Sequence, residues 1–197
     1  MIRPLVLQSW PGAAFWTVYL LQMSAEAWLM ARVRPTRAGR SQDRGSMALI
    51  LAAFAGAMLA ATAVAVTIPA ATLWRHRDGW FWSGVAVYAA GGWLRQVCFR
   101  ILGRHFTPAV TVTEGQPVIE RGPYRWIRHP SYTGGALMFL GYGLALTNAW
   151  SVAVMSAAAA LAYGYRIRVE ERALVETLGD SYRAYMRRTK RLVPWIW

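Results

Sequence analysis

The sequence predicts an all-α integral membrane protein, a bundle of about five transmembrane helices folded as one domain. Of its 197 residues, 56% are hydrophobic, and the mean hydropathy is +0.25. The apolar residues gather in runs long enough to cross a bilayer, which takes roughly 20 residues. Basic residues gather between these runs, as is typical of membrane-protein loops. Because no linker or low-complexity stretch divides the chain, we expect a single domain over residues 1–197.

Five segments meet the length requirement for a membrane span. The second is the cleanest of them and is rich in alanine. The fourth and fifth are separated only by Asn148 and Ala149, so they must form a tight antiparallel helical hairpin. In chain order, the expected spans are about 13–31, 47–73, 80–99, 131–147 and 150–167.

A sixth helical segment is expected after the fifth span, over residues 173–188. Its apolar side chains face one side and its arginines the other, the pattern of an amphipathic helix on a membrane surface. Gly179 should weaken or break it locally. The pattern fits a cover over a cytoplasmic pocket and simple anchoring at the interface equally well. The apolar face holds Leu174, Leu178, Tyr182, Tyr185 and, at its edge, Met186.

The distribution of basic residues predicts the orientation of the chain. Eighteen arginines and lysines follow the first, third and fifth spans, and three lie on the other side. The positive-inside rule therefore places the C-terminus in the cytoplasm and the N-terminus outside. A composition rich in alanine and arginine points to a bacterial inner membrane. The three on the outer side are Arg3, Arg75 and Arg77, and the first inner loop holds Arg32, Arg34, Arg37, Arg40 and Arg44.

Composition also excludes several classes of function. The formal net charge of +13 could suggest a nucleic-acid partner, but its placement between apolar runs favours anionic lipid headgroups instead. A single cysteine, Cys98, excludes an internal disulfide and a cysteine-rich metal site. Three scattered histidines make a poor metal cage, so we expect no metal; they are His76, His105 and His129.

Two charged residues within the spans, Glu26 and Arg95, lie at matching depths. Each is about one turn from the cytoplasmic end of its helix. A charge inside a membrane segment usually has a partner. We therefore predict a buried ion pair between the first and third helices. The alternative is that each side chain extends to the headgroups on its own.

The most informative segment surrounds the start of the fourth span. Pro130 suits the first helical turn, where its missing N–H has no cost, and this places His129 at the N-cap. The positive end of the helix dipole would stabilise an anionic group there. Glycines follow on the same helix and suit either close helix packing or close approach of a ligand. They are Gly134, Gly135, Gly141 and Gly143.

The end of the fifth span carries a second polar cluster. Tyr163, Arg166 and Glu170 lie at spacings of three and four residues, so they share one helix face. Glu171 lies about 100° around the helix from Glu170, so the two carboxylates cannot point the same way. One can meet a ligand while the other pairs with an arginine. A solvated, charge-rich helix end is the simpler alternative.

These motifs, in their order along the chain, resemble the isoprenylcysteine carboxyl methyltransferase family of integral membrane enzymes. The resemblance covers roughly residues 94–197, and the first two spans carry no recognised motif. We therefore divide the domain into N-terminal helices (1–79) and a motif-bearing core (80–197). The motifs are Leu102-Gly103-Arg104-His105-Phe106, Gly122-Pro123-Tyr124, Arg128-His129-Pro130-Ser131-Tyr132-Thr133-Gly134, Tyr165-Arg166-Ile167-Arg168-Val169-Glu170-Glu171, Gly179-Asp180-Ser181-Tyr182-Arg183-Ala184-Tyr185 and Arg191-Leu192-Val193-Pro194.

The resemblance implies a methyltransferase that uses S-adenosylmethionine at the cytoplasmic membrane boundary. By the same resemblance, Arg166 and Glu171 would act catalytically, where the methyl group meets the acceptor. The residues implied to bind the cofactor are Tyr124, Arg128, His129, Tyr132, Gly134 and Glu170.

The acceptor is left open by the sequence. It is expected to be lipophilic, either an isoprenylcysteine-like carboxylate or a small isoprenoid or lipid. A carboxylate acceptor would use a cation such as Arg166 for orientation, whereas an amine or a thiol must lose a proton, which Glu171 or His129 could accept. A phospholipid N-methyltransferase is one alternative. An NADPH-dependent membrane reductase of related fold is another, with Arg183, Arg187 and Arg188 near the cofactor's 2′-phosphate.

Overall fold

A computed structural model describes residues 4–32, 43–107, 110–113 and 115–194. Within these ranges the chain forms helices joined by loops, and its only β-bridges are the isolated pairs Thr72–Asn148 and Ile127–Lys190. Arg3, Arg34, Arg37 and Arg40, on which the orientation prediction drew, lie outside the described residues. The α-helices are α1 (Ser9–Arg32), α2 (Ser46–Thr67), α3 (Arg77–Leu102), α4 (Pro130–Ala145), α5 (Ala149–Leu178) and α6 (Asp180–Arg188).

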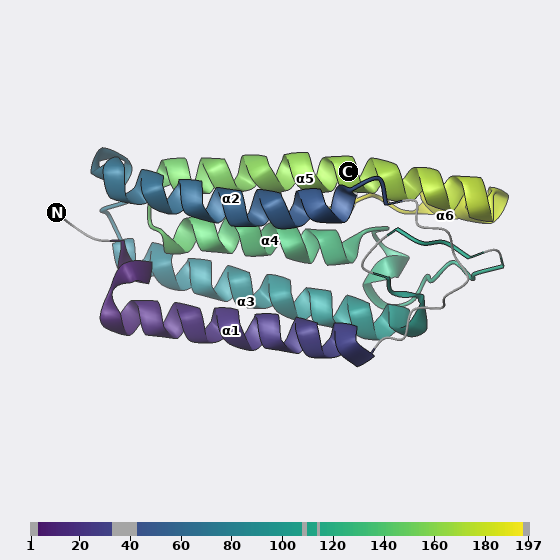
Figure 1. Ribbon diagram of the computed structural model, residues 1–197, viewed down its shortest axis with the longest axis horizontal. Helices are drawn as coiled ribbons and strands as arrows, with labels where there is room; N and C mark the ends of the chain where they lie inside the picture. The colour runs from purple at the N-terminus through teal and green to yellow at the C-terminus, as the bar shows by residue number, and fades with distance from the viewer. Residues whose placement is uncertain (1–3, 33–42, 108–109, 114, 195–197) are drawn as a thin grey trace.

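Five long helices lie side by side in an elongated bundle (Figure 1). α3 packs along α4, α2 packs along α5, and α4 and α5 form the antiparallel hairpin that the short connection predicted. Asn148 caps α5, because its side chain accepts a hydrogen bond from the Ser151 N–H at 3.2 Å. The C-terminal ends of α1, α3 and α5 and the N-terminal ends of α2 and α4 meet at one end of the bundle. We call this the loop end.

Two boundaries differ from those expected. The second helix ends at Thr67 and not near residue 73, because Pro69 supplies no N–H to continue it and a short 3-10 turn, Pro69–Ala71, follows. The amphipathic helix expected over 173–188 is divided. α5 continues to Leu178, Gly179 ends it with φ +56°, and α6 then begins at Asp180.

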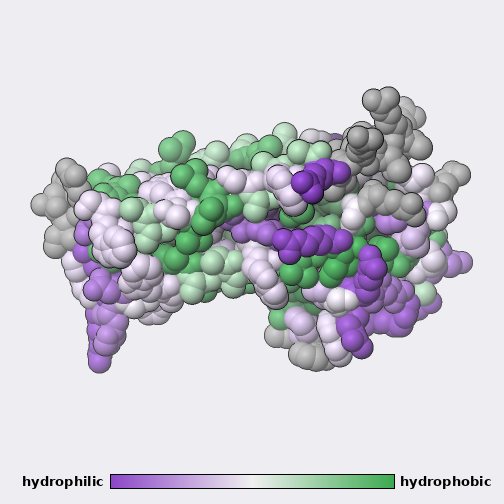
Figure 2. All heavy atoms as spheres, turned by 90° about the horizontal axis from the view of Figure 1, so that it is seen from below, coloured by the Kyte–Doolittle hydropathy of each residue, from purple (hydrophilic) through white to green (hydrophobic). Residues whose placement is uncertain are grey.

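By length and composition, α2 is the one helix among the described residues that is apolar enough to cross a membrane by itself. α4 has 16 residues, and the other long helices carry charged side chains such as Glu26, Arg95 and Arg166. The number of membrane crossings and their direction therefore stay predictions. One face of the molecule shows hydrophobic residues over much of its middle, where a hydrophilic stripe interrupts them, and hydrophilic residues gather at the ends, most of all at the loop end (Figure 2).

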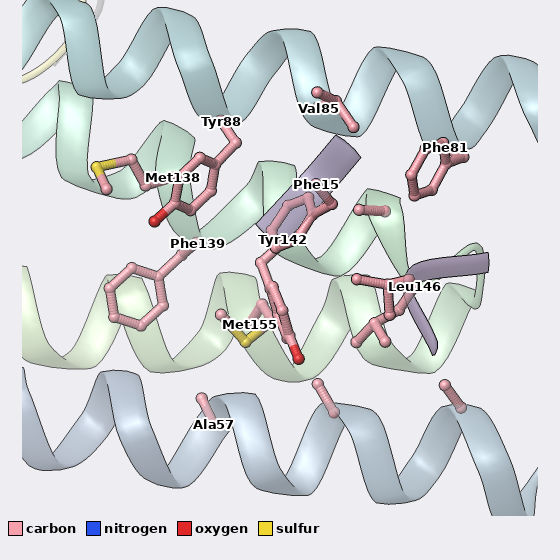
Figure 3. Close-up of a cluster of buried hydrophobic side chains, with 14 of the residues drawn as sticks. Phe15, Ala57, Phe81, Val85, Tyr88, Met138, Phe139, Tyr142, Leu146 and Met155 are labelled. Carbon is pink, nitrogen blue, oxygen red and sulfur yellow. The ribbon is translucent and has the colours of Figure 1, made fainter. Parts of the chain in front are cut away.

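The core lies between α1, α3, α4 and α5, with alanines of α2 closing one side (Figure 3). Phe15 of α1 packs edge-on against Tyr88 of α3, with ring centroids 5.4 Å apart. Gly91 and Gly134 let α3 and α4 approach closely. A Cβ added to either glycine would lie 2.5–2.6 Å from the other glycine's carbonyl oxygen. These contacts hold α4, and therefore its N-terminus, in a fixed position at the loop end.

Candidate active site

A cavity of about 500 Å³ opens inside the loop end of the bundle. Its walls come from all six α-helices and from the chain between α3 and α4. Its volume lies in the range that suits a cofactor or a small ligand. The polar and ionisable side chains that line it include Glu26, Arg95, His105, Tyr124, Arg128, His129, Tyr132, Tyr163, Arg166, Glu170, Tyr182 and Tyr185.

His129 occupies the N-cap of α4 with Pro130 in the first turn, as predicted. Its backbone is fixed by the C-terminal segment, because the N–H groups of Arg128 and His129 donate to the carbonyls of Lys190 and Arg191 at 2.7 and 3.0 Å. The His129 ring is buried and stacks on Tyr132, with centroids 5.4 Å apart and planes 10° apart. The residue is thereby held at the cavity in one orientation.

Three side chains form a continuous hydrogen-bonded surface on one side of the cavity, and we call them the cavity wall: Tyr132, Arg166 and Glu170. Arg166 Nε donates to the Tyr132 hydroxyl at 3.0 Å, and that hydroxyl donates to Glu170. Arg166 and Glu170 are one helical turn apart on α5, so both face the cavity. The Glu170 side chain stays 28% exposed, which leaves it accessible from the cavity.

Glu171 lies in a second group directly behind this surface. Its carboxylate contacts Arg128 Nε at 2.8 Å, His129 Nε2 at 3.2 Å and Arg191 Nη2 at 2.9 Å. We call Glu171, Arg128 and Arg191 the backing layer. Burial alone would raise the pKa of Glu171, but the hydrogen bonds and charges of His129, Arg191 and Arg128 outweigh burial and lower this pKa to about 2. Glu171 is therefore ionised throughout the physiological range.

Arg128 also fastens the C-terminal segment from inside the backing layer. Its Nη1 donates to the carbonyl oxygens of Met186, at 3.4 Å, and of Thr189. Tyr185 adds a hydrogen bond from its hydroxyl to the Tyr124 carbonyl at 2.6 Å. α6 is thus tied over the cavity, and its buried Tyr182 and Tyr185 line the cavity. The apolar face predicted for this region faces the cavity.

Asp43, which precedes α2, meets Arg166 at the far side of the wall. It forms an ion pair with Arg166 Nη1 and accepts hydrogen bonds from the Met47 and Val110 N–H groups at 3.1 and 3.2 Å. Ser46 Oγ donates to the same carboxylate at 3.0 Å. Burial alone would raise the pKa of Asp43, but these hydrogen bonds and the Arg166 charge hold it below its usual range.

The predicted pair between Glu26 and Arg95 is confirmed. Arg95 Nε and Nη2 contact the two carboxylate oxygens of Glu26 at 2.7 and 3.0 Å, a bidentate arrangement. Gln22 donates to the same carboxylate at 3.3 Å, and Gln96 donates to Gln22 at 2.9 Å. This network joins α1 to α3 and forms another side of the cavity.

The structure brings together most of the residues that the sequence singled out. Gly134 and Glu171 do not line the cavity. Gly134 lies in the contact between α3 and α4, so it serves close helix packing. Glu171 points behind the cavity wall, because adjacent residues on a helix are about 100° apart. The six that line the cavity are Tyr124, Arg128, His129, Tyr132, Arg166 and Glu170.

Sequence reasoning missed Asp43 and the contact of Arg191 with Glu171. Arg191 belonged to a recognised motif but had no assigned role. For Asp43 the only local signal is an acidic residue shortly before Ser46 and Met47, a pattern typical of helix starts. Nothing in that pattern indicates a partner 123 residues away.

Comparisons with known proteins agree with the motifs. The sequence model of the isoprenylcysteine carboxyl methyltransferase family matches residues 84–176. The Schizosaccharomyces pombe protein-S-isoprenylcysteine O-methyltransferase is 29% identical over 58% of this chain and 49% of its own length. Methanethiol S-methyltransferase 1 of Bradyrhizobium diazoefficiens is 33% identical over 52% of this chain and 32% of its own length. The methanethiol S-methyltransferase of Mycobacterium tuberculosis is 36% identical over 41% and 34%.

The chain spans about half the length, or less, of these curated relatives. A solved structure of the eukaryotic intramembrane Ras methyltransferase ICMT matches all of this chain and 69% of that protein, with a TM-score of 0.71 and 20% identity. That likeness shows the fold. The resemblance predicted from the motifs is confirmed: residues 84–176 match the isoprenylcysteine carboxyl methyltransferase family, and the whole chain has the fold of an intramembrane member of that family.

Proposed function

We propose that this chain is a membrane methyltransferase that uses S-adenosylmethionine to methylate a lipophilic acceptor. One observation carries the proposal. One cavity is lined by polar side chains of the family motifs, which we call its polar end, and by apolar side chains of α1 and α2, which we call its apolar end. A charged, water-soluble donor and a lipid-soluble acceptor need such a two-part site, and the loop end of the bundle offers both parts side by side.

The polar end fits the donor by the chemistry of its side chains. Glu170 offers a carboxylate for an ammonium group or ribose hydroxyls, and His129 adds a ring nitrogen. The buried Tyr124 hydroxyl belongs to a residue on the cavity lining and has only the weakly hydrogen-bonding Cys98 thiol beside it, so a ligand atom can serve as a stronger partner. When bound, S-adenosylmethionine supplies a methyl group on a positively charged sulfur.

The apolar end fits an alkyl or isoprenyl chain. Met23 and Met30 of α1 and Met47, Ile50 and Leu51 of α2 line it. Methionine side chains adapt their shape to an irregular apolar ligand. Apolar side chains of the motif-bearing core, among them Phe99, Leu102 and Ile119, also line the cavity, so the N-terminal helices would share the acceptor side of the site with that core.

The two groups of side chains suggest different roles in the reaction. The wall residues Arg166 and Glu170 face the cavity and can contact donor or acceptor directly. Glu171 acts in this proposal as a positioning residue, because it holds Arg128 and His129 from behind. Positioning the acceptor atom about 3–3.5 Å from the methyl carbon can account for several kcal/mol of the barrier. Exclusion of water by α6 would strengthen the electrostatic contacts inside.

Isothermal titration of the detergent-solubilised protein with S-adenosylhomocysteine tests this proposal, with NADPH as a parallel ligand. We expect S-adenosylhomocysteine to bind, and Glu170→Gln to weaken that binding by about tenfold or more, since a charge-assisted contact is lost. Glu176→Gln, an exposed change two turns along α5, is the matched control and should bind normally. Binding of NADPH alone would contradict the proposal and favour a reductase. Binding of neither ligand to folded protein would also contradict it.

A further inference from the structure

The charges around the cavity come in matched pairs. Each of the three arginines that line it, in the part of the chain that the structure describes, contacts a different carboxylate: Arg95 contacts Glu26, Arg128 contacts Glu171, and Arg166 contacts Asp43. Glu170 also lines the cavity and forms no ion pair with an arginine or lysine of the described residues. Arg191 shares Glu171 with Arg128, so the four arginines and the four carboxylates of this set carry equal and opposite charge.

The Asp43–Arg166 pair is the one that matters for the acceptor. Arg166 belongs to the cavity wall, whereas Asp43 comes from the connection between α1 and α2, outside the region matched by the family. Arg166 Nη1 donates to Asp43 and to Ser46 Oγ, at 2.7 Å from the latter, while Nε donates to Tyr132. The Arg166 side chain is only 5% exposed. Its charge is therefore compensated inside the protein, by a carboxylate that a ligand cannot easily displace.

An anionic acceptor would gain little from such an arginine. A carboxylate entering the cavity would meet a guanidinium already bound to Asp43, and it would lie near both Asp43 and the carboxyl group of Glu170. Like charges a few ångströms apart cost several kcal/mol at the effective dielectric of a protein interior. A protonated amine would suffer a different repulsion, from the positive charge of the methyl donor. An uncharged acceptor group meets neither penalty.

We propose that Asp43 is a specificity-determining residue that neutralises Arg166, so that the cavity selects an uncharged nucleophile, a thiol on an apolar chain, over a carboxylate. This inference rests on the function proposed above. In the reaction, the thiol sulfur forms the new bond to the methyl carbon as the bond from that carbon to the donor sulfur breaks. The donor leaves as a neutral thioether. The thiol proton passes to Nδ1 of His129, whose Nε2 lies against Glu171.

Matched ligands with one alkyl chain test this selectivity: dodecanethiol, dodecan-1-ol and dodecanoate. The protein is placed in nanodiscs, loaded with S-adenosylhomocysteine and melted at increasing ligand content, and apparent affinities are taken from the shift in Tm. At about pH 8 the carboxylic acid is ionised and most of the thiol is protonated. We expect both uncharged ligands to bind about tenfold or more tightly than dodecanoate.

Asp43→Asn supplies the decisive variant, because the amide oxygen still accepts hydrogen bonds but carries no charge. It should lessen the compensation of the Arg166 charge and narrow the difference in affinity between the thiol and the carboxylate by about tenfold. Asp180→Asn removes an exposed carboxylate, 98% accessible on α6, and should leave the difference in affinity between the thiol and the carboxylate unchanged. If Asp43→Asn does not fold, the comparison of ligands on the unmodified protein decides alone.

Two results would overturn the inference while the proposed function stands: dodecanoate binding as tightly as the thiol, or a difference in affinity that Asp43→Asn leaves intact. Failure of the protein to bind S-adenosylhomocysteine at all would overturn the proposed function and this inference with it. The loading step therefore separates the two failures.

Discussion

The cavity wall and the backing layer use adjacent residues of one helix for different purposes. Glu170 faces the cavity and stays partly exposed, whereas Glu171 is buried among Arg128, His129 and Arg191. The single-residue step of about 100° along α5 separates them. The two glutamates form one motif in the sequence but have different roles. Glu170 in the cavity wall can contact ligands, and Glu171 in the backing layer holds the cavity wall in place.

The difference predicts that stability and ligand binding depend on different glutamates. The backing layer fixes the start of α4 to the C-terminal segment, so damage to it should unfold the loop end. The cavity wall forms fewer contacts that hold the fold together, so substitutions in it should mainly lower ligand affinity. Four predictions test this comparison, in decreasing order of expected effect.

Glu171→Gln should produce the largest loss of stability. It removes the carboxylate that compensates two arginines, and breaking a buried ion pair from one side costs about 3–5 kcal/mol. The thermal unfolding midpoint in detergent, followed by tryptophan fluorescence, measures the loss. Glu176→Gln on the exposed side of the same helix is the control. Equal midpoints for the two variants would show that the backing layer does not stabilise the fold.

Acid should weaken the same layer within a defined pH window. The pKa of Glu171 is about 2 in the folded protein against an ordinary value of 4.5. A carboxyl with a depressed folded pKa stabilises the fold above its unfolded pKa, and this stabilisation is lost as pH falls toward the folded pKa. We expect a loss on the order of 2 kcal/mol between about pH 5 and pH 3. Glu171→Gln lacks the group, so its unfolding midpoint should fall less over that range.

The sequence predicts the bundle well because apolar runs and their spacing are local properties. The five long helices, the short hairpin and the N-cap at His129 all follow from local patterns. The pair of Glu26 and Arg95 also followed, since two charges at equal depth in neighbouring spans need partners. The end of α5 could not be predicted from hydropathy. The helix continues past Ile167 because one of its faces stays buried there, at Glu171 and Ala173.

The candidate site is predictable only as far as the motifs extend. They indicated which residues gather at the loop end, but not which of two adjacent glutamates faces the cavity. Asp43 was beyond prediction, because its contact with Arg166 joins two segments 123 residues apart. Such a contact depends on the packing of α2 against α5, which no local pattern reports.

Tyr132→Phe should damage the wall with little harm to the fold. The variant loses the hydroxyl that accepts from Arg166 and donates to Glu170 but keeps the stacked ring. We expect a loss of about 1 kcal/mol in stability, typical of one hydrogen bond. S-adenosylhomocysteine affinity, measured by titration, should fall by more than the stability loss implies, since Glu170 is no longer oriented. A normal affinity would show that the Tyr132 hydroxyl does not position Glu170 for binding.

Arg188→Gln should have the smallest effect, and it tests whether burial is what distinguishes the backing layer. Arg188 contacts Glu120 at 3.0 Å, much as Arg191 contacts Glu171 at 2.9 Å. The first pair is exposed on both sides, whereas the Glu171 carboxylate is buried. Exposed ion pairs contribute about 0–1 kcal/mol, because water and salt screen them. The unfolding midpoint of Arg188→Gln should therefore match that of the unmodified protein, and adding salt should not separate them. A midpoint as low as that of Glu171→Gln would mean that the C-terminal segment is held by its surface charges as much as by the buried carboxylate.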